Sequence, residues 1–188
     1  QRSPSHAARA SERGSGADPV HHVTVEDGVE LIRGMRVTTR GTWADLGAGN
    51  GTFTRALARR LGPNSRIYAV DRDVEAVESL RQSSAKATSL IIPVCADLTR
   101  PFELPGLDET MLDGMLIANT LHFVRDADSV LPRLVAWVRP GGRIVLIEYD
   151  RRAASRWVPY PIPIARLPAL ARSAGLTTPA ITATRPSA

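Results

Sequence analysis

The stretch Trp43-Ala44-Asp45-Leu46-Gly47-Ala48-Gly49-Asn50-Gly51-Thr52-Phe53 decides the fold of this chain. A short apolar run ends in an acid, and three alternating glycines follow before a helical pattern begins. We predict a strand over 42–46, a sharp turn, and a helix over 51–61 with apolar side chains every four residues (Phe53, Leu57, Leu61). Glycine allows the backbone of such a turn to bend tightly and to approach a ligand closely.

Two further acids close the next apolar runs. Asp71 ends the run over 67–70, and Asp97 ends the run over 90–96. With Asp45, they are expected at the carboxyl ends of successive parallel strands, which meet at the crevice where open α/β sheets bind ligands. The pattern therefore predicts an α/β fold: a Rossmann-like doubly wound, mostly parallel sheet with helices on both faces.

The remaining elements follow from periodicity. We predict helices over 25–35, 73–83 and 126–138, and strands over 66–70, 90–96, 111–118 and 143–148. Pro93 cannot donate a ladder hydrogen bond, so the third strand is expected at an edge of the sheet. After Asp150 we expect a proline-rich aromatic loop over 151–163, a short helix capped by Gly175, and a sixth strand near 179–184. The helix over 73–83 is expected to bury Val74, Val77 and Leu80.

Composition indicates an ordinary globular domain. The chain has 188 residues, of which 43% are hydrophobic and 23% charged. No apolar run approaches the roughly 20 residues of a membrane span, and no stretch resembles a secretory signal. The single cysteine, Cys95, excludes an intramolecular disulfide and favours a cytoplasmic location; it is expected in the core.

The net charge of +5 and the high pI raise the question of a nucleic-acid partner. The arginines are dispersed along the chain, however, so this partner is disfavoured without being excluded. Residues 1–22 are rich in Ser, Arg, Ala and Gly and are expected to form a flexible tail before a single domain over 23–188. His21 and His22 lack further ligands, so no metal site is predicted.

Five ordered motifs resemble those of the class I S-adenosylmethionine-dependent methyltransferases. They lie at 45–51, 69–71, 96–98, 113–119 and 139–143, and the resemblance covers about 42–149, more than half of the chain. It implies S-adenosyl-L-methionine as the cofactor. The family usually adds a final antiparallel strand, which is expected to be missing from the chain as given.

The resemblance also implies a role for each acid. Asp45 would meet the ammonium group of the cofactor, Asp71 the ribose hydroxyls and Asp97 the adenine amino group. Backbone amides of the glycine turn would meet the carboxylate at a helix start, where the helix dipole favours an anion. The full set of expected cofactor-binding residues is Asp45, Gly47, Ala48, Gly49, Gly51, Asp71, Arg72, Asp97, Leu98 and Asn119.

A dinucleotide-binding domain would share the glycines and the acid at 71. In this chain the third glycine follows the second by two residues rather than three. The acids at 45 and 97 would have no role in binding a pyrophosphate. The sequence therefore favours a methyltransferase over a dehydrogenase.

Methyl transfer is an in-line displacement that depends mostly on alignment, and it needs a base only when the acceptor loses a proton. Candidate bases are His122, just past the fourth strand, and Glu148, Tyr149 and Asp150 at the end of the fifth. A histidine that is simply bonded to a loop carbonyl stays open as an alternative for His122. In the loop over 151–163, the aromatic side chains Trp157 and Tyr160 are expected to line the substrate pocket.

The stretch over 119–123 and the absence of an added domain look most like small-molecule methyltransferases of the ubiquinone/menaquinone-biosynthesis type. Such an enzyme predicts an enclosed apolar pocket lined by the loop over 151–163 and the first helix. An RNA methyltransferase would instead join Arg151, Arg152 and Arg156 to the tail arginines in one basic surface. A third alternative is a catalytically silent cofactor-binding or interaction protein, whose cofactor pocket would be filled by side chains. The acceptor atom and the oligomeric state stay open.

Overall fold

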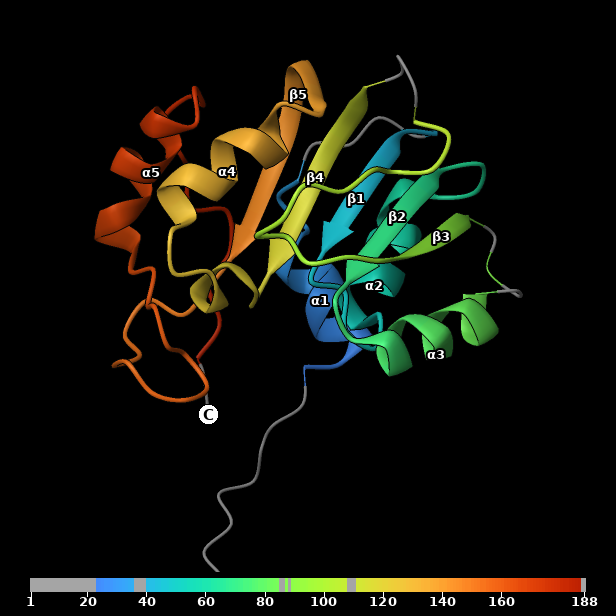
Figure 1. Cartoon of the computed structure of the whole chain (residues 1–188), viewed down its shortest axis with the longest axis horizontal. Coiled ribbons are helices and arrows are strands. Elements are labelled where there is room, and N and C mark those ends of the chain that lie inside the picture. Colours follow the sequence, from blue (N-terminus) through green and yellow to red (C-terminus); the bar gives the residue numbers. More distant parts are fainter. Residues whose placement is uncertain (1–22, 36–39, 85–86, 88, 108–110, 187–188) are drawn as a thin grey trace, which may run out of the picture.

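The structure is a computed structural model, and it describes residues 23–35, 40–84, 87, 89–107 and 111–186. Its centre is a sheet of five parallel strands in the order β3-β2-β1-β4-β5 (Figure 1). The strands are β1 (Thr42–Leu46), β2 (Arg66–Asp71), β3 (Leu90–Cys95), β4 (Leu112–Ala118) and β5 (Val138–Ile147). The order reverses between β1 and β4, which is the switch point where open sheets of this kind form a ligand crevice. The expected α/β Rossmann-like architecture is confirmed.

Helices cover both faces of the sheet. They are α1 (Val25–Leu31), α2 (Thr52–Leu61), α3 (Val74–Ser84), α4 (Ala127–Val135) and α5 (Leu167–Ser173), with single 3-10 turns η1 (Leu121–Phe123) and η2 (Ile164–Arg166). Alternate residues of β4 pack into the two core layers on opposite faces of the sheet. Met115 and Ile117 pack with α4 and α5, whereas Leu116 packs with α1 and α2.

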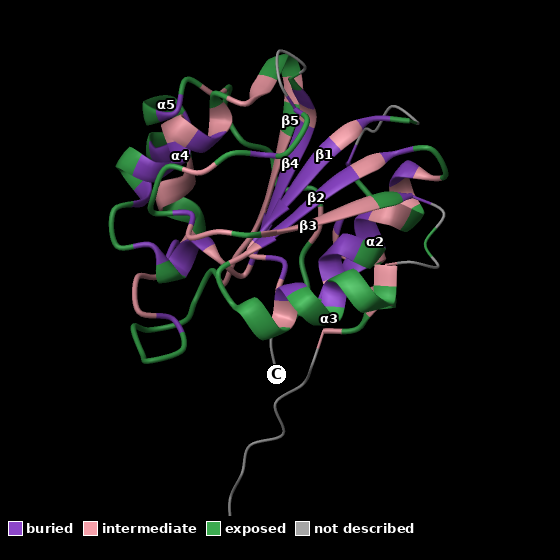
Figure 2. Ribbon diagram, turned by 45° about the vertical axis from the view of Figure 1, so that its right-hand side comes forward, coloured by how far each residue is buried: buried purple, intermediate pink, exposed green. Residues whose placement is uncertain are grey.

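The placement of β3 agrees with the proline in its sequence. Pro93 lies in an edge strand, as expected, and β3 is only half-buried, whereas β1, β2 and β4 are buried along almost their whole length (Figure 2). Cys95 ends this edge strand and is exposed, so its expected place in the core is wrong. In an edge strand, which has only one neighbouring strand, the last side chain of an apolar run can face solvent. The apolar run itself does not show this.

The first helix begins as its sequence suggests but is shorter. Thr24 and Asp27 form a capping box, in which the Thr24 hydroxyl accepts from the Asp27 amide at 3.1 Å and the Asp27 carboxylate accepts from the Thr24 amide at 2.9 Å. The helix ends at Leu31 instead of the expected 35. Val74, expected in the buried stripe of α3, is 68% exposed because it is the first residue of that helix, and Val77 and Leu80 make the buried contacts.

Two expectations at the C-terminal side are wrong. β5 begins at Val138, five residues early, so Pro140-Gly141-Gly142 lie within the strand, beside a register shift against β4. No strand forms over 177–186, because these residues find no ladder partner in the described part of the chain. The segment instead reaches α1, where Arg185 pairs with Asp27 at 2.7 Å.

No helix in the described ranges is both long enough and apolar enough to cross a bilayer. The tail expected over 1–22 lies outside the described residues.

Candidate cofactor and acceptor site

The glycine turn between β1 and α2 is built by positive φ angles. Gly47, Gly49 and Gly51 have φ values of 80°, 49° and 79°. A Cβ at Gly47 would lie 2.1 Å from the Thr120 hydroxyl oxygen, and one at Gly51 would lie 2.2 Å from a methyl carbon of Leu80. A Cβ at Gly49 would meet nothing within 4 Å. The first and third glycines therefore allow close packing, whereas the second faces open space.

This turn is bonded to the end of β2. Val70 accepts hydrogen bonds from the amides of Gly47 at 2.8 Å and of Ala48 at 3.0 Å. The Asp71 carboxylate accepts from the Gly49 amide at 2.7 Å and from the Asp73 amide at 2.9 Å. Each oxygen of Asp71 is thus oriented by one backbone amide and keeps a second lone pair, which suits a pair of neighbouring hydroxyls.

Asp45 is a buried acid, and one of its two carboxyl oxygens has no hydrogen-bond partner among the described residues. Its side chain is 1% exposed, and the Thr54 hydroxyl donates to Oδ2 at 2.6 Å. Oδ1 has no hydrogen-bond partner among the described residues. Burial, opposed by the Thr54 hydrogen bond and aided to a smaller extent by the nearby Asp71 carboxylate, raises the pKa of Asp45 to about 7. A buried acceptor without a partner is costly, so a cationic or N–H donor from a ligand would be well placed here.

Asp97 and its neighbours lie just beyond β3. The Thr99 amide and hydroxyl donate to Asp97 at 2.8 and 2.7 Å, and these hydrogen bonds, the amide first, hold the pKa of Asp97 below its usual range. Leu98 is buried in the main core, whereas Arg72, at the end of β2, is exposed. Asp97 therefore presents a half-exposed, ionised carboxylate at the same edge of the sheet as Asp71.

The end of β4 closes the site from the other side of the switch point. Asn119 has a φ of 51°, and its amide donates to the Ile147 carbonyl at 2.8 Å. Thr120 follows, and its hydroxyl donates to the Ala118 carbonyl at 2.8 Å while it packs against Gly47. The left-handed residue thus turns the chain toward η1 and places the start of η1 beside the glycine turn.

A buried His–Glu pair lies where β4 and β5 end. The Nδ1 atom of His122 lies 2.6 Å from Oε2 of Glu148, and the two side chains are 2% and 4% exposed. The other carboxylate oxygen accepts from the backbone amides of Leu121 at 2.8 Å and His122 at 3.2 Å. Glu148 is therefore fully engaged in orienting η1 and the imidazole, which does not support its expected role as a base. Because Nδ1 donates to the carboxylate, Nε2 is the ring nitrogen that can take a proton.

Two tyrosines border this pair. The Tyr149 ring lies 5.7 Å from the His122 ring, and the Tyr160 amide donates to the His122 carbonyl at 2.9 Å. The Tyr160 hydroxyl accepts from Nε of Arg125 at 3.2 Å. Asp150 instead accepts from the Ile164 amide at 2.9 Å and thereby orders the loop before η2. The structure thus brings His122, Glu148, Tyr149 and Tyr160 together and leaves Asp150 outside the cluster.

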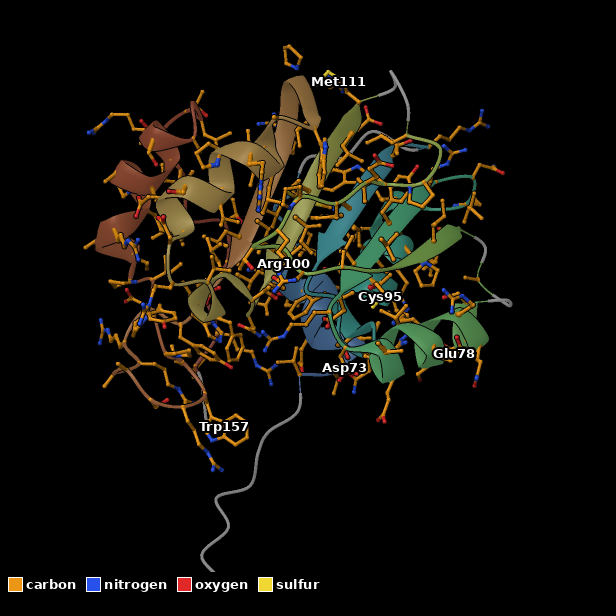
Figure 3. All side chains as sticks on the ribbon, viewed as in Figure 1. Asp73, Glu78, Cys95, Arg100, Met111 and Trp157 are labelled. Carbon is orange, nitrogen blue, oxygen red and sulfur yellow. The ribbon has the colours of Figure 1, made fainter. Side chains whose placement is uncertain are left out.

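Trp157 does not lie with them. Its side chain projects away from the rest of the ribbon (Figure 3), and the residue is 67% exposed. The Arg156 guanidinium stacks 4.5 Å from the centre of the ring. Ser155 and Val158 exchange two backbone hydrogen bonds that form a tight turn, and Val158 is buried, so the turn holds Trp157 outward. The expected role of Trp157 as a pocket wall has no support in this arrangement, because the sequence does not show that Val158 is the inward residue.

A hollow of about 350 Å³ lies between the turn after β3 and the start of α4, and we call it the α4 hollow. Its lining does not include the loop over 151–163 or α1, from which the sequence suggested an enclosed pocket. The lining residues are Thr99, Val124, Arg125, Asp126, Ser129, Val130 and Arg133. Within the described ranges, no group of three or more His, Cys, Asp or Glu side chains is arranged to hold a metal ion.

Two site residues were missed by sequence reasoning. Thr54 donates to Asp45, and its signal was a hydroxyl on the apolar face of α2, between Phe53 and Leu57. Thr120 packs against Gly47 across 73 residues of sequence, and no local pattern marks such a contact.

The geometry described above agrees with the comparison to known families. A family model described as a methyltransferase domain matches residues 44–146, which is more than half of the chain. The chain therefore belongs to the class I S-adenosylmethionine-dependent methyltransferases.

Two relatives illustrate the sequence similarity. The biotin biosynthesis bifunctional protein BioCD of Bordetella avium is 31% identical over 132 residues, which make up 68% of this chain and 26% of that protein. An uncharacterized methyltransferase of Mycobacterium bovis is 32% identical over 114 residues, or 61% of this chain and 42% of that protein. The chain thus spans less than half the length of either relative.

Solved structures show the same fold at low identity. A SAM-dependent methyltransferase from Aquifex aeolicus superposes with a TM-score of 0.63 and 17% identity over 79% of both chains. The YcgJ protein of Bacillus superposes with a TM-score of 0.62 and 14% identity over 79% of this chain and 68% of that one.

S-adenosylmethionine is the cofactor of this family, and the residues present fit it. The unpartnered oxygen of buried Asp45 suits its ammonium group. The spare lone pairs of Asp71 suit the ribose diol, and the open space at Gly49 lets a ligand approach the backbone. Asp97 offers an ionised acceptor for the adenine amino group.

Proposed function

We propose that this protein methylates a hydroxyl group on a small-molecule acceptor and that His122 is the general base. The observation that carries the proposal is the buried His122–Glu148 pair at the carboxyl edge of the sheet, with 2.6 Å between Nδ1 and the carboxylate. A buried carboxylate that fixes the tautomer of a histidine is the arrangement that makes Nε2 a competent base.

Different residues of the chain would perform different parts of such a reaction. Asp45, Asp71, Asp97 and the glycine turn would hold the cofactor. When bound, S-adenosylmethionine supplies the methyl group, whose bond to sulfur breaks with the electron pair staying on sulfur. His122 would take at Nε2 the proton that the acceptor hydroxyl loses as it gains the methyl group. Glu148 would stabilise the resulting imidazolium, and S-adenosylhomocysteine and a methyl ether would be the products.

The ubiquinone/menaquinone-type resemblance of the stretch over 119–123 supports a ring hydroxyl as the acceptor. Aromatic groups at the site agree with this choice. Phe123 is 45% exposed, and its ring lies 4.4 Å from that of His122, so a flat apolar surface borders the proposed base. The open space beside Gly49 argues against a cofactor pocket that is filled by side chains.

The test is methyl transfer to catechols, phenols and quinols, followed by the formation of S-adenosylhomocysteine. We expect His122→Gln to lower kcat by about 100-fold or more, because a positioned base contributes that much or more. Glu148→Gln should also lower kcat, because its NH2 group would face either Nδ1 of His122 or the backbone amides of Leu121 and His122, which all donate to the carboxylate. Both variants should bind S-adenosylmethionine as the wild type does.

An acceptor that needs no base separates catalysis from structure. With 4-nitrophenol at a pH where it is already ionised, His122→Gln should retain nearly the wild-type rate. Equal losses with ionised and un-ionised acceptors would show that His122 has a structural role and would overturn the assignment of the base.

A second candidate is methylation of RNA, favoured by the exposed turn that carries Trp157. Arg156 stacks on Trp157, and Arg151 beside it has a side chain that is 95% exposed. Stacking platforms flanked by arginines suit single-stranded nucleic acid. The tail arginines that this alternative invokes lie outside the described residues. Salt-dependent binding of a single-stranded oligoribonucleotide that is lost in Trp157→Ala would favour this candidate.

A further inference from the structure

We propose that the acceptor carries an anionic group as well as an aromatic ring, and that Arg125 binds this anionic group at the rim of the His122 site. The inference rests on the proposed function and names the substrate class of that same site. It starts from the position of Arg125, two residues after the 3-10 turn η1 that carries His122.

Arg125 is connected through Tyr160 to the segment that carries the proposed base. Its Nε donates to the Tyr160 hydroxyl at 3.2 Å, and its guanidinium carbon lies 5.9 Å from the centre of the Tyr160 ring. Tyr160 in turn donates its amide to the His122 carbonyl at 2.9 Å. Tyr160 therefore links the Arg125 side chain to the backbone of His122.

The guanidinium is exposed, and its charge is not neutralised by an acid. Within the described residues, Arg125 forms no ion pair, whereas neighbouring arginines do: Arg151 pairs with Asp150 and Arg166 with Asp128. The bond to Tyr160 uses only one of the five N–H donors of the guanidinium. The remaining donors form the planar fork that binds a carboxylate or phosphate in a bidentate manner.

Acids near Arg125 are already engaged. Asp126 caps α4, where it accepts from the Ser129 amide at 3.2 Å and the Ser129 hydroxyl at 2.7 Å. Asp128 is paired with Arg166 at 2.6 Å, and Glu148 is buried with His122. Asp128 and Glu148 are therefore paired with other groups, and the Asp126 carboxylate, which lines the same hollow as Arg125, is held by Ser129.

Space for the anionic group lies beside Arg125, in a hollow that His122 does not line. Arg125 lines the α4 hollow, whose volume of about 350 Å³ is in the range of small-molecule sites. A second guanidinium, that of Arg152, lies 5.1 Å from the centre of the Tyr149 ring, which itself lies 5.7 Å from the His122 ring. Arg125 and Arg152 thus each lie against a tyrosine of the His122 cluster, while Phe123 and Tyr149 offer ring faces. Aromatic side chains beside an arginine fork suit a hydroxyaryl acid.

The test compares acids with their neutral amides. 4-Hydroxybenzoate, 3,4-dihydroxybenzoate and 4-hydroxyphenylacetate, and the three corresponding amides, would be titrated calorimetrically into the protein saturated with S-adenosylhomocysteine. We expect at least one acid to bind about tenfold or more tightly than its amide, because a charge-assisted bidentate pair has that strength.

Variants then locate the anion site. Arg125→Gln should remove the preference for the acid and leave the affinity for the amide unchanged, and Arg125→Lys should restore part of the preference. Arg151→Gln is the matched control, since its side chain is 95% exposed on the adjoining loop, and it should keep the full preference. Unchanged affinity for S-adenosylhomocysteine would show that each variant is folded.

The outcomes separate this inference from the proposed function. If no acid binds better than its amide, or if the preference survives Arg125→Gln, the anion site is wrong, whereas methyl transfer to neutral phenols through His122 would still stand. If S-adenosylmethionine fails to bind, or if His122→Gln keeps its full kcat with un-ionised phenols, the proposed function fails irrespective of the anion preference.

Discussion

At the scale of single residues, the site depends on groups whose environment differs from what their position in the sequence suggests. Asp45 occupies the expected place at the end of β1, yet its burial and its single partner, Thr54, raise its pKa to about 7. The unfolded chain exposes the same carboxyl group to water, where its pKa is about 4. The folded protein therefore holds the Asp45 carboxyl group in a partly protonated state near neutral pH.

Asp45→Asn should remove the pH dependence of stability that the buried carboxyl group causes. Between about pH 4 and pH 7 the folded state keeps a proton that the unfolded state has lost, so the stability contributed by Asp45 falls as the pH rises through this window. The variant lacks this titration. We expect the difference in free energy of unfolding, variant minus wild type, to increase by roughly 2–4 kcal/mol between about pH 4 and pH 8.

Urea unfolding of both proteins across this range would measure the gain. A difference that stays constant with pH would mean that Asp45 is ionised in the folded protein throughout.

Gly49→Ala should weaken binding of S-adenosylmethionine at least tenfold. Its φ of 49° and the open space around it mean that a new methyl group would project into the volume assigned to the cofactor. Gly62→Ala is the matched control, because Gly62 also has a positive φ, 78°, and nothing within 4 Å of an added Cβ. Both variants should lose about 1–2 kcal/mol of stability from the left-handed backbone.

Calorimetric titration would measure the affinities and urea unfolding the stabilities. Equal affinities in the two variants would place the cofactor away from Gly49.

At the scale of elements, the pairing of β1 with β4 builds the switch point, and it depends on one close contact. Trp43 lies opposite Gly114 in the parallel ladder, and its indole fills the space that a side chain at 114 would need. A Cβ on Gly114 would lie 2.4 Å from the ring. Small and large residues are therefore matched across two strands that are 71 residues apart in sequence.

Gly114→Ala should destabilise the protein by about 2–3 kcal/mol, because the indole must shift in a packed core. Trp43→Phe shortens the ring and costs no hydrogen bond, since the buried Nε1 of Trp43 has no partner among the described residues. The double variant should therefore lose less stability than the sum of the two single losses. Urea unfolding of the four proteins gives the coupling, and strict additivity would show that the two residues do not contact each other.

At the scale of the whole molecule, the sheet divides the hydrophobic core into two layers. Met115 and Leu116 are adjacent on β4 and fully buried, but they face opposite layers. α4 and α5 cover one layer, and α1 and α2 cover the other (Figure 1).

Met115→Ala and Leu116→Ala should each cost about 2–5 kcal/mol, since both leave a cavity beside the sheet. Both variants should unfold in one transition, with far-UV circular dichroism and tryptophan fluorescence changing together, because a single sheet links the two layers. If one variant showed two separate transitions, the layers would be independent units.

Much of the architecture was predictable, because the signals are local. Apolar runs that end in acids marked β1, β2 and β3, and Pro93 marked the edge strand. The capping box of Thr24 and Asp27 marked the start of α1. Predictions failed where the outcome depends on a distant partner. The segment over 179–184 reads as a strand but finds no ladder neighbour in the described residues, and Cys95 is exposed because β3 is an edge strand.

The sequence by itself determined the family and the order of the acids along the chain, and it predicted which groups would meet the cofactor, because motif and periodicity depend on neighbouring residues. Only the tertiary structure decided the surroundings of the candidate site residues. It joined His122 to Glu148 across 26 residues, left Asp45 with one unpartnered oxygen and turned Trp157 outward. Burial, hydrogen-bond partners and charge depend on which distant segments pack together, and local sequence patterns do not contain that information.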